Sequence, residues 1–189
     1  MARMTLTDFE ARYRADHDPW GYLTSDYERE KYDATLAACG AGPFADALEL
    51  GSSIGVFSAL LAPRCERLTT IDAAPTAVES ARRRLAGMPQ VDVTLGSIPD
   101  GIPDRAFDLV VASEILYYLS ASELAATLAR LESCVAPAAR LVAVHWRPAG
   151  PERPLDAARV HRVLHEQPWL VPAGSGGTDE YLLDVMERR

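Results

Sequence analysis

Apolar and polar positions along the chain follow two different periods, and their alternation predicts an α/β protein. Residues 5–15 and 25–39 carry apolar side chains at helical spacing, so each segment predicts a helix. Ser25 and Glu28, three residues apart, form the capping-box pattern of a helix start. From there on, strand-like and helical segments alternate. The predicted strands span residues 45–50, 68–71, 91–95, 107–112, 140–145, 169–172 and 181–187, and the predicted helices between them span residues 56–62, 75–85, 120–135 and 156–165.

Strands that alternate with helices favour a mostly parallel sheet, because parallel neighbours need a long crossover connection. The run 107–112 is continuously apolar, which is typical of a strand covered on both faces. The last two strands are joined by the glycine-rich residues 173–177, which predict a hairpin or a flexible tip and an antiparallel edge. We therefore expect a Rossmann-like α/β fold with a seven-stranded sheet, helices on both of its faces and two further N-terminal helices.

A turn of small residues follows the first predicted strand, and an acid ends the second. The turn places Glu49 ahead of Gly51 and Gly55, with Ser53 between the glycines, and Asp72 closes the next strand. Glycines let such a turn pass close beneath a bulky ligand, because no Cβ intervenes and φ is free. Strand, glycine turn, helix, strand and acid form the unit from which open α/β sheets build nucleotide sites.

The spacing of this turn discriminates between nucleotides. It differs from the G-x-G-x-x-G of dinucleotide enzymes, which disfavours a nicotinamide oxidoreductase, and no G-K-[ST] of a phosphate loop follows. The carboxylate of Glu49 would repel a pyrophosphate, whereas it suits the ammonium of a methionine moiety. Asp72 can accept hydrogen bonds from two ribose hydroxyls. The pattern therefore predicts S-adenosylmethionine as the cofactor.

Composition and charge restrict the partners. Lysine and arginine number 19 against 27 acidic residues, so the net charge of −8 argues against a nucleic-acid partner. No apolar run approaches the roughly 20 residues that a membrane helix needs, and no apolar signal-peptide core opens the chain, so we expect a cytoplasmic protein without membrane contact. The three cysteines are scattered, and His161 and His165 lack an evident third ligand, so we expect no metal site.

Several motifs resemble a known family. Residues 48–57, 68–72 and 107–119 look like the corresponding segments of class I S-adenosylmethionine-dependent methyltransferases. Within that superfamily the chain is similar to the nodulation N-methyltransferase (NodS-like) family, through the early Asp18-Pro19-Trp20, a helix with Glu28, Glu30 and Tyr32, and the run from Ser113 to Tyr118. At 189 residues we expect one domain, residues 1–189, in which a helical cap (1–42) precedes a cofactor-binding core (43–147) and a C-terminal helix and hairpin (148–189).

The resemblance also implies which residues contact the cofactor. The glycine turn would surround the methionine and ribose, and Asp72 would bind the ribose hydroxyls. Ser53 stands where many class I enzymes have glycine, and its hydroxyl is free to bond the methionine carboxylate. Other contacts would bracket the adenine or close over the methionine end. The full set implied by the resemblance is Trp20, Glu49, Gly51, Ser53, Gly55, Asp72, Ala73, Ser97, Ile98 and Ser113.

Candidates for catalysis follow the fourth and fifth predicted strands. Methyl transfer needs the nucleophile held roughly 3–3.5 Å from the methyl carbon in a dry pocket. Glu114 and Tyr117 are candidates for steering an amine, and His145 is the candidate base for a hydroxyl. The resemblance implies an amino-sugar amine as acceptor. Another small amine is an alternative acceptor. The alternative functions are a small-molecule O-methyltransferase and a non-catalytic cofactor-binding subunit. The oligomeric state, monomer or homodimer, stays open.

Overall fold

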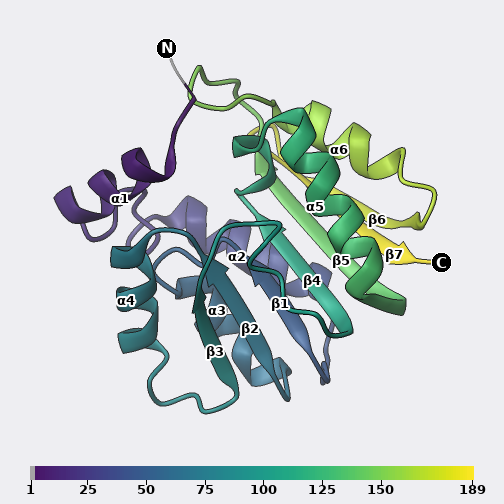
Figure 1. The fold of residues 1–189 in the computed structure, drawn as a ribbon, viewed down its shortest axis with the longest axis horizontal. Helices are drawn as coiled ribbons and strands as arrows, with labels where there is room; N and C mark the ends of the chain where they lie inside the picture. Colours follow the sequence, from purple (N-terminus) through teal and green to yellow (C-terminus); the bar gives the residue numbers. More distant parts are fainter. Residues whose placement is uncertain (1–2) are drawn as a thin grey trace.

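The computed structural model describes residues 3–189 and arranges them in three layers, with one sheet between two sets of helices (Figure 1). Two short 3-10 turns, η1 (Ala62–Arg64) and η2 (Leu116–Tyr118), complete the pattern. The helices are α1 (Leu6–Ala15), α2 (Asp26–Cys39), α3 (Val56–Leu61), α4 (Pro75–Arg84), α5 (Ala121–Cys134) and α6 (Ala157–His165). The strands are β1 (Ala47–Leu50), β2 (Leu68–Asp72), β3 (Val91–Leu95), β4 (Phe107–Ser113), β5 (Val135–Trp146), β6 (Leu170–Gly177) and β7 (Tyr181–Arg188).

The seven strands form one sheet in the order β3-β2-β1-β4-β5-β7-β6. The first five run parallel, β7 runs antiparallel to β5, and β6 runs antiparallel to β7 at the edge. The chain moves outward from β1 to β3 and then returns to β4 on the other side of β1. The strand order therefore reverses between β1 and β4, and ligands of such sheets bind outside the carboxyl ends of the strands at this switch point.

Two large apolar cores, one on each face, hold α2, α3, α5 and α6 to the sheet. Val110 and Ala112 of β4 pack in the core that contains α5 and α6, whereas Leu109 and Val111 pack in the core that contains α2 and α3. All four side chains are fully buried, because successive side chains of a strand point to opposite faces and both faces are covered. The prediction of a doubly covered central strand is confirmed.

Side-chain caps set where four of the helices begin. Thr5, Ser25, Ser120 and Asp156 each accept a hydrogen bond from the backbone N–H three residues further along the chain. Such a cap contributes about 0.5–2 kcal/mol, because it satisfies one of the N–H groups that a helix start leaves without a partner. These residues are the polar positions ahead of the apolar pattern, so the predicted helix starts are confirmed to within a residue.

Two predicted segments differ from the structure. The strand predicted at residues 140–145 begins instead at Val135, because α5 ends at Cys134 and the chain continues extended to pair with Phe107. Residues 173–177, predicted as a link, belong to β6 and pair with β7 through backbone hydrogen bonds that need no side chain. The turn falls at residues 178–180 instead. Among the described residues, no helix has the length and apolar character to span a bilayer.

Candidate active site

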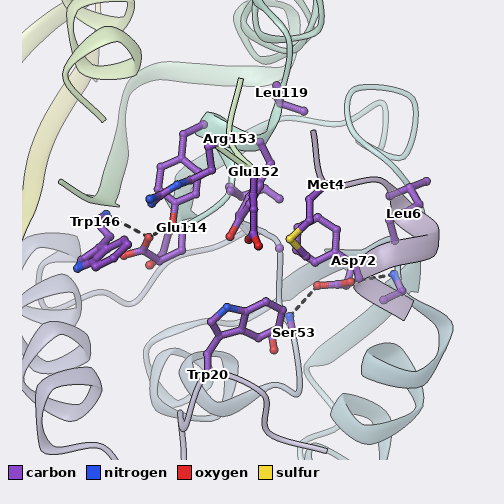
Figure 2. Close-up of a pocket in the computed structure, with 18 of the residues that line it drawn as sticks. Met4, Leu6, Trp20, Ser53, Asp72, Glu114, Leu119, Trp146, Glu152 and Arg153 are labelled. Atoms are coloured by element: carbon purple, nitrogen blue, oxygen red, sulfur yellow. Dashed lines mark hydrogen bonds between the residues drawn. The ribbon is translucent and has the colours of Figure 1, made fainter. Parts of the chain in front are cut away.

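A cavity of about 960 Å³ lies at the carboxyl ends of β1, β2 and β4. The N-terminal segment, parts of α1 and α2 and the loop 149–153 close its other sides. Figure 2 shows Asp72 and Ser53 on one side of the cavity, Glu114 and Trp146 on the other, and Trp20 between them. The pocket is therefore elongated, and we call its two parts the Asp72 end and the Glu114 end.

Asp72 organises the first of these ends. Its Oδ2 accepts a hydrogen bond from the Ser53 N–H (2.8 Å), and its Oδ1 accepts one from the Ala74 N–H (2.9 Å). Burial raises the pKa of Asp72, and these backbone hydrogen bonds counter the rise. Each carboxylate oxygen keeps acceptor capacity for a further donor, so two adjacent ligand hydroxyls can bind here. A ribose diol fits this arrangement.

The turn after β1 brings the backbone close to the cavity. Gly51 has φ 79°, and a Cβ there would lie 3.2 Å from the Cβ of Ile115, so the position needs glycine. Ser53 also has a positive φ, of 50°, and its Oγ accepts a hydrogen bond from the Tyr13 hydroxyl at 2.6 Å. The Ser53 hydroxyl keeps its own proton to donate to a ligand. The same contact holds α1 over the turn.

Five more residues from the predicted cofactor set line the same cavity. They come from the loop before α2, from the end of β2, from the loop after β3 and from the end of β4. The indole of Trp20 lies 5.3 Å from the ring of Tyr13 and 6.0 Å from that of Tyr22, so aromatic packing fixes its place at the cavity wall. The five are Trp20, Ala73, Ser97, Ile98 and Ser113.

Two members of the predicted cofactor set lie outside the cavity. Glu49 is 4% exposed, and its Oε2 accepts hydrogen bonds from Ser58 Oγ (2.5 Å) and Thr70 Oγ1 (2.9 Å). The Oε2 atom thus bonds α3 and β2, and the expected contact between Glu49 and a methionine ammonium stays a prediction. Burial raises the pKa of Glu49 to about 7. Gly55 does not line the cavity either. A Cβ at this residue would meet the Ala81 Cα at 3.1 Å, so the glycine allows α3 to pack on α4.

The Glu114 end is built from side chains. Glu114 directly follows β4 with φ 57°, a strained value for a residue with a side chain. Its Oε1 accepts a hydrogen bond from Lys31 Nζ (2.8 Å), and its Oε2 accepts one from the Trp146 N–H (3.1 Å), which is drawn in Figure 2. The Tyr117 hydroxyl donates to the same Oε2. The structure thus brings the predicted Glu114 and Tyr117 together in the cavity wall.

Lys31 is a central residue of this end that the sequence analysis did not single out. Its side chain is 2% exposed, and its Nζ lies 3.0 Å from Glu28 Oε1 as well as 2.8 Å from Glu114 Oε1. The Glu28 carboxylate bonds Lys31 and does not return to the N–H of Ser25, so only half of the expected capping box forms. In the sequence, only the helical spacing of Glu28, Lys31 and Thr35 could have indicated that Lys31 is buried, because it places them on one face of α2. The same spacing is also typical of a solvated helix face.

His145 does not reach the cavity, so its predicted role as base is wrong. The side chain is fully buried, and its Nε2 accepts a hydrogen bond from the Leu116 N–H at 3.2 Å. Since Nε2 accepts, Nδ1 carries the proton and donates to His161 Nε2 (3.1 Å), and His161 Nδ1 in turn donates to Asp184 Oδ2 (2.8 Å). Burial lowers the pKa of His145 well below its usual range, which keeps the ring neutral. The chain of bonds fixes the start of η2, the turn that carries Tyr117.

The carboxylate of Asp184 also lies 2.8 Å from His165 Nε2, one helical turn from His161. The sequence had shown no carboxylate near these histidines, because Asp184 is contributed by β7. Among residues 3–189, no group of three or more side chains is arranged to hold a metal ion. His161 and His165 each bond the Asp184 carboxylate.

A sheet of this order, with a glycine turn after β1 and an acid that lines the cavity at the end of β2, has the class I methyltransferase fold. The chain belongs to the NodS family, because residues 5–149 match the family model for Nodulation protein S (NodS).

Curated relatives and a solved structure agree with this membership. Nodulation protein S of Rhizobium tropici is 34% identical over 144 residues, which cover 75% of this chain and 60% of that protein. Nodulation protein S of Bradyrhizobium diazoefficiens is 37% identical over 133 residues, covering 69% of this chain and 64% of that protein. The chain thus spans less than two thirds of the length of these relatives. The crystal structure of N-methyltransferase NodS from Bradyrhizobium japonicum WM9 in complex with S-adenosyl-L-homocysteine is 26% identical, covers 98% of this chain and 99% of that one, and has a TM-score of 0.88.

Proposed function

We propose that this chain is an S-adenosylmethionine-dependent N-methyltransferase that acts on an amino sugar or another small amine. The proposal rests on family membership and on a cavity whose two ends differ in chemistry. One end presents Asp72 and a glycine turn, which suit a nucleoside. The other presents the carboxylate of Glu114 beside a buried lysine, which suits an amine.

The Asp72 end fits the cofactor of the solved relative, which holds S-adenosyl-L-homocysteine. Asp72 would bind the ribose diol, Ser97 and Ile98 would bracket the adenine, and Gly51 and Ser53 would pass beneath the methionine part. When bound there, S-adenosylmethionine supplies an electrophilic methyl group on a sulfonium. Trp20 and its aromatic neighbours would exclude water from this part of the cavity.

Glu114 is the residue that we expect to prepare the acceptor. An amine attacks only as the neutral base, so an incoming ammonium must first lose a proton. Glu114 can accept a hydrogen bond from that ammonium and take the proton. Lys31, Tyr117 and the Trp146 N–H hold the carboxylate in one orientation from three directions. Such fixed positioning is the main contribution a protein makes to a displacement of this kind.

The single observation that favours nitrogen over oxygen is the composition of the cavity wall. The described residues that line it include several carboxylates and tyrosines but no histidine. A hydroxyl acceptor needs a stronger base than an amine does, and His145, the predicted base, is buried elsewhere. The cavity therefore suits an acceptor whose proton a carboxylate can take.

An acceptor screen with labelled cofactor tests this proposal. S-adenosylmethionine with a labelled methyl group is incubated with matched pairs of amines, amino sugars and their hydroxyl counterparts. We expect label on nitrogen, located by mass spectrometry and NMR. Label on oxygen would establish the O-methyltransferase alternative. Binding of S-adenosylhomocysteine by calorimetry without transfer to any acceptor would favour a non-catalytic cofactor-binding protein.

A further inference from the structure

Two buried polar atoms at the Glu114 end have no hydrogen-bond partner among the described residues. They are Oε2 of Glu28 and the hydroxyl of Tyr27, neighbours in the first turn of α2. Both side chains line the cavity, and Glu28 is only 8% exposed. Buried polar groups in folded proteins are almost always hydrogen-bonded, because leaving one unpaired forfeits its hydration without replacement. These two atoms, on side chains that line the cavity, are therefore candidates for hydrogen bonds to a ligand.

Lys31 cannot satisfy the free oxygen of Glu28. An ammonium has three donors, and two of them point to Glu28 Oε1 and Glu114 Oε1. The Nζ also lies 4.9 Å from the centre of the Tyr27 ring, which occupies its remaining side with a cation–π contact. The lysine is thus fully engaged, and Glu28 Oε2 remains an acceptor.

The charge of this cluster favours a cationic ligand. Two carboxylates, Glu28 and Glu114, share the single ammonium of Lys31, which leaves an excess of one negative charge when both are ionised. Burial raises the pKa of Glu28, the Lys31 charge lowers it, and Glu114 and Asp18 raise it further. A second cation next to Glu28 would favour its ionised form and supply the missing donor. A neutral hydroxyl would supply only the donor.

We propose that Glu28 Oε2, with the Tyr27 hydroxyl, binds the ammonium group of the acceptor and makes Glu28 the residue that selects amines over hydroxyls. This inference rests on the proposed function and names a second residue for it. Glu28 and Glu114 contact the same lysine and both line the cavity, so Glu28 would hold the ammonium at the end where Glu114 would take its proton. Glu28 thus acts in binding, and Glu114 acts in turnover.

Binding of matched sugars to the full chain saturated with S-adenosylhomocysteine tests the selection. Glucosamine carries the ammonium, and glucose carries a hydroxyl at the same carbon. We expect wild type to bind glucosamine the more tightly, and Glu28→Gln to lose about tenfold of that affinity while its binding of glucose is unchanged. Tyr27→Phe removes one hydroxyl, so we expect its affinity for glucosamine to fall about threefold. The matched control is Glu30→Gln, an exposed acid on the same helix, which should behave as wild type.

Kinetics separate this inference from the proposed function. With an amine acceptor, Glu28→Gln should raise the KM about tenfold and change the kcat little, and melting curves with S-adenosylhomocysteine titrations confirm that the variant is folded and loaded. Amine methylation with the same KM in Glu28→Gln and Glu30→Gln would overturn the role of Glu28 and leave the function standing. Equal binding of the two sugars by wild type, or no binding, would also overturn it. Transfer to oxygen would overturn the proposed function itself.

Discussion

The two ends of the cavity differ in the groups that form them, mainly backbone at the Asp72 end and mainly side chains at the Glu114 end. The Asp72 end is made by one β1–α3–β2 unit, in which the backbone N–H of Ser53 meets a carboxylate 19 residues further along the chain. The Glu114 end is made by side chains from α2, from the residue after β4 and from the end of β5. Its central contact, Lys31 to Glu114, joins residues 83 apart.

This difference assigns a separate task to each end. A site made of backbone and one acid is set by the topology of the strand–turn–helix unit, so it belongs to the fold and suits one cofactor. A site made of side chains from distant elements changes with single substitutions and leaves the sheet intact. The second end is therefore where a protein of this fold can be adapted to a particular acceptor.

Replacing Asp72 should have the largest effect and should fall on cofactor binding. Asp72→Ala would remove the two charge-assisted hydrogen bonds that we propose to a ribose diol, each worth about 1.5–3 kcal/mol, so we expect roughly a thousandfold loss of affinity. Calorimetric titration with S-adenosylhomocysteine measures it, alongside a melting curve. Asp92→Ala, which removes an exposed acid from the neighbouring strand, is the control and should bind as wild type does. An unchanged dissociation constant in Asp72→Ala would refute the ribose assignment.

Replacing Glu114 should act on turnover instead. Glu114→Gln keeps the shape and an acceptor oxygen but cannot take a proton, so we expect the kcat to fall about a hundredfold, at the low end for a general base. The affinity for S-adenosylhomocysteine should stay within about threefold, because Glu114 lies away from the Asp72 end. A variant that loses cofactor binding and turnover together would show that the two ends do not act separately.

The fold and the Asp72 end could be predicted because local patterns determine them. Period-two apolar runs, the position of Gly51 and the acid at the end of β2 each depend on a few neighbouring residues. The place of Glu49 could not be predicted in detail, because strand alternation gives two faces and does not say which of them meets the ligand. His145 was misassigned for the same reason, since its side chain is buried against His161 of α6.

The Glu114 end could be predicted only in part. Glu114 and Tyr117 follow a central strand and share its position at the switch point. Lys31 gave no local signal, because a lysine among acids on a helix is normally solvated, and only the packing of α2 against the sheet buries it. A buried ion pair between distant elements is a property of the tertiary structure, so one sequence read locally does not show it.

Glu49 offers a smaller test, which checks that this carboxylate lies outside both ends of the cavity. Its pKa in the folded protein is raised from the usual 4.5 to about 7, so the folded state holds the proton more tightly than the unfolded chain does. The stabilising contribution is therefore complete below pH 4.5 and is lost as pH rises through 7.

Glu49→Gln removes the titrating group and keeps an acceptor for Ser58 and Thr70. A shift of this size corresponds to about 3 kcal/mol at most, and burying an amide offsets part of it, so we expect the variant to be more stable than wild type by about 1–2 kcal/mol at pH 8. The advantage should shrink toward pH 5 in denaturant melts, while the affinity for S-adenosylhomocysteine stays unchanged. An equal advantage at both pH values would contradict the raised pKa. A large loss of cofactor affinity would show that Glu49 contacts the cofactor, because its bonds to Ser58 and Thr70 involve no residue that lines the cavity.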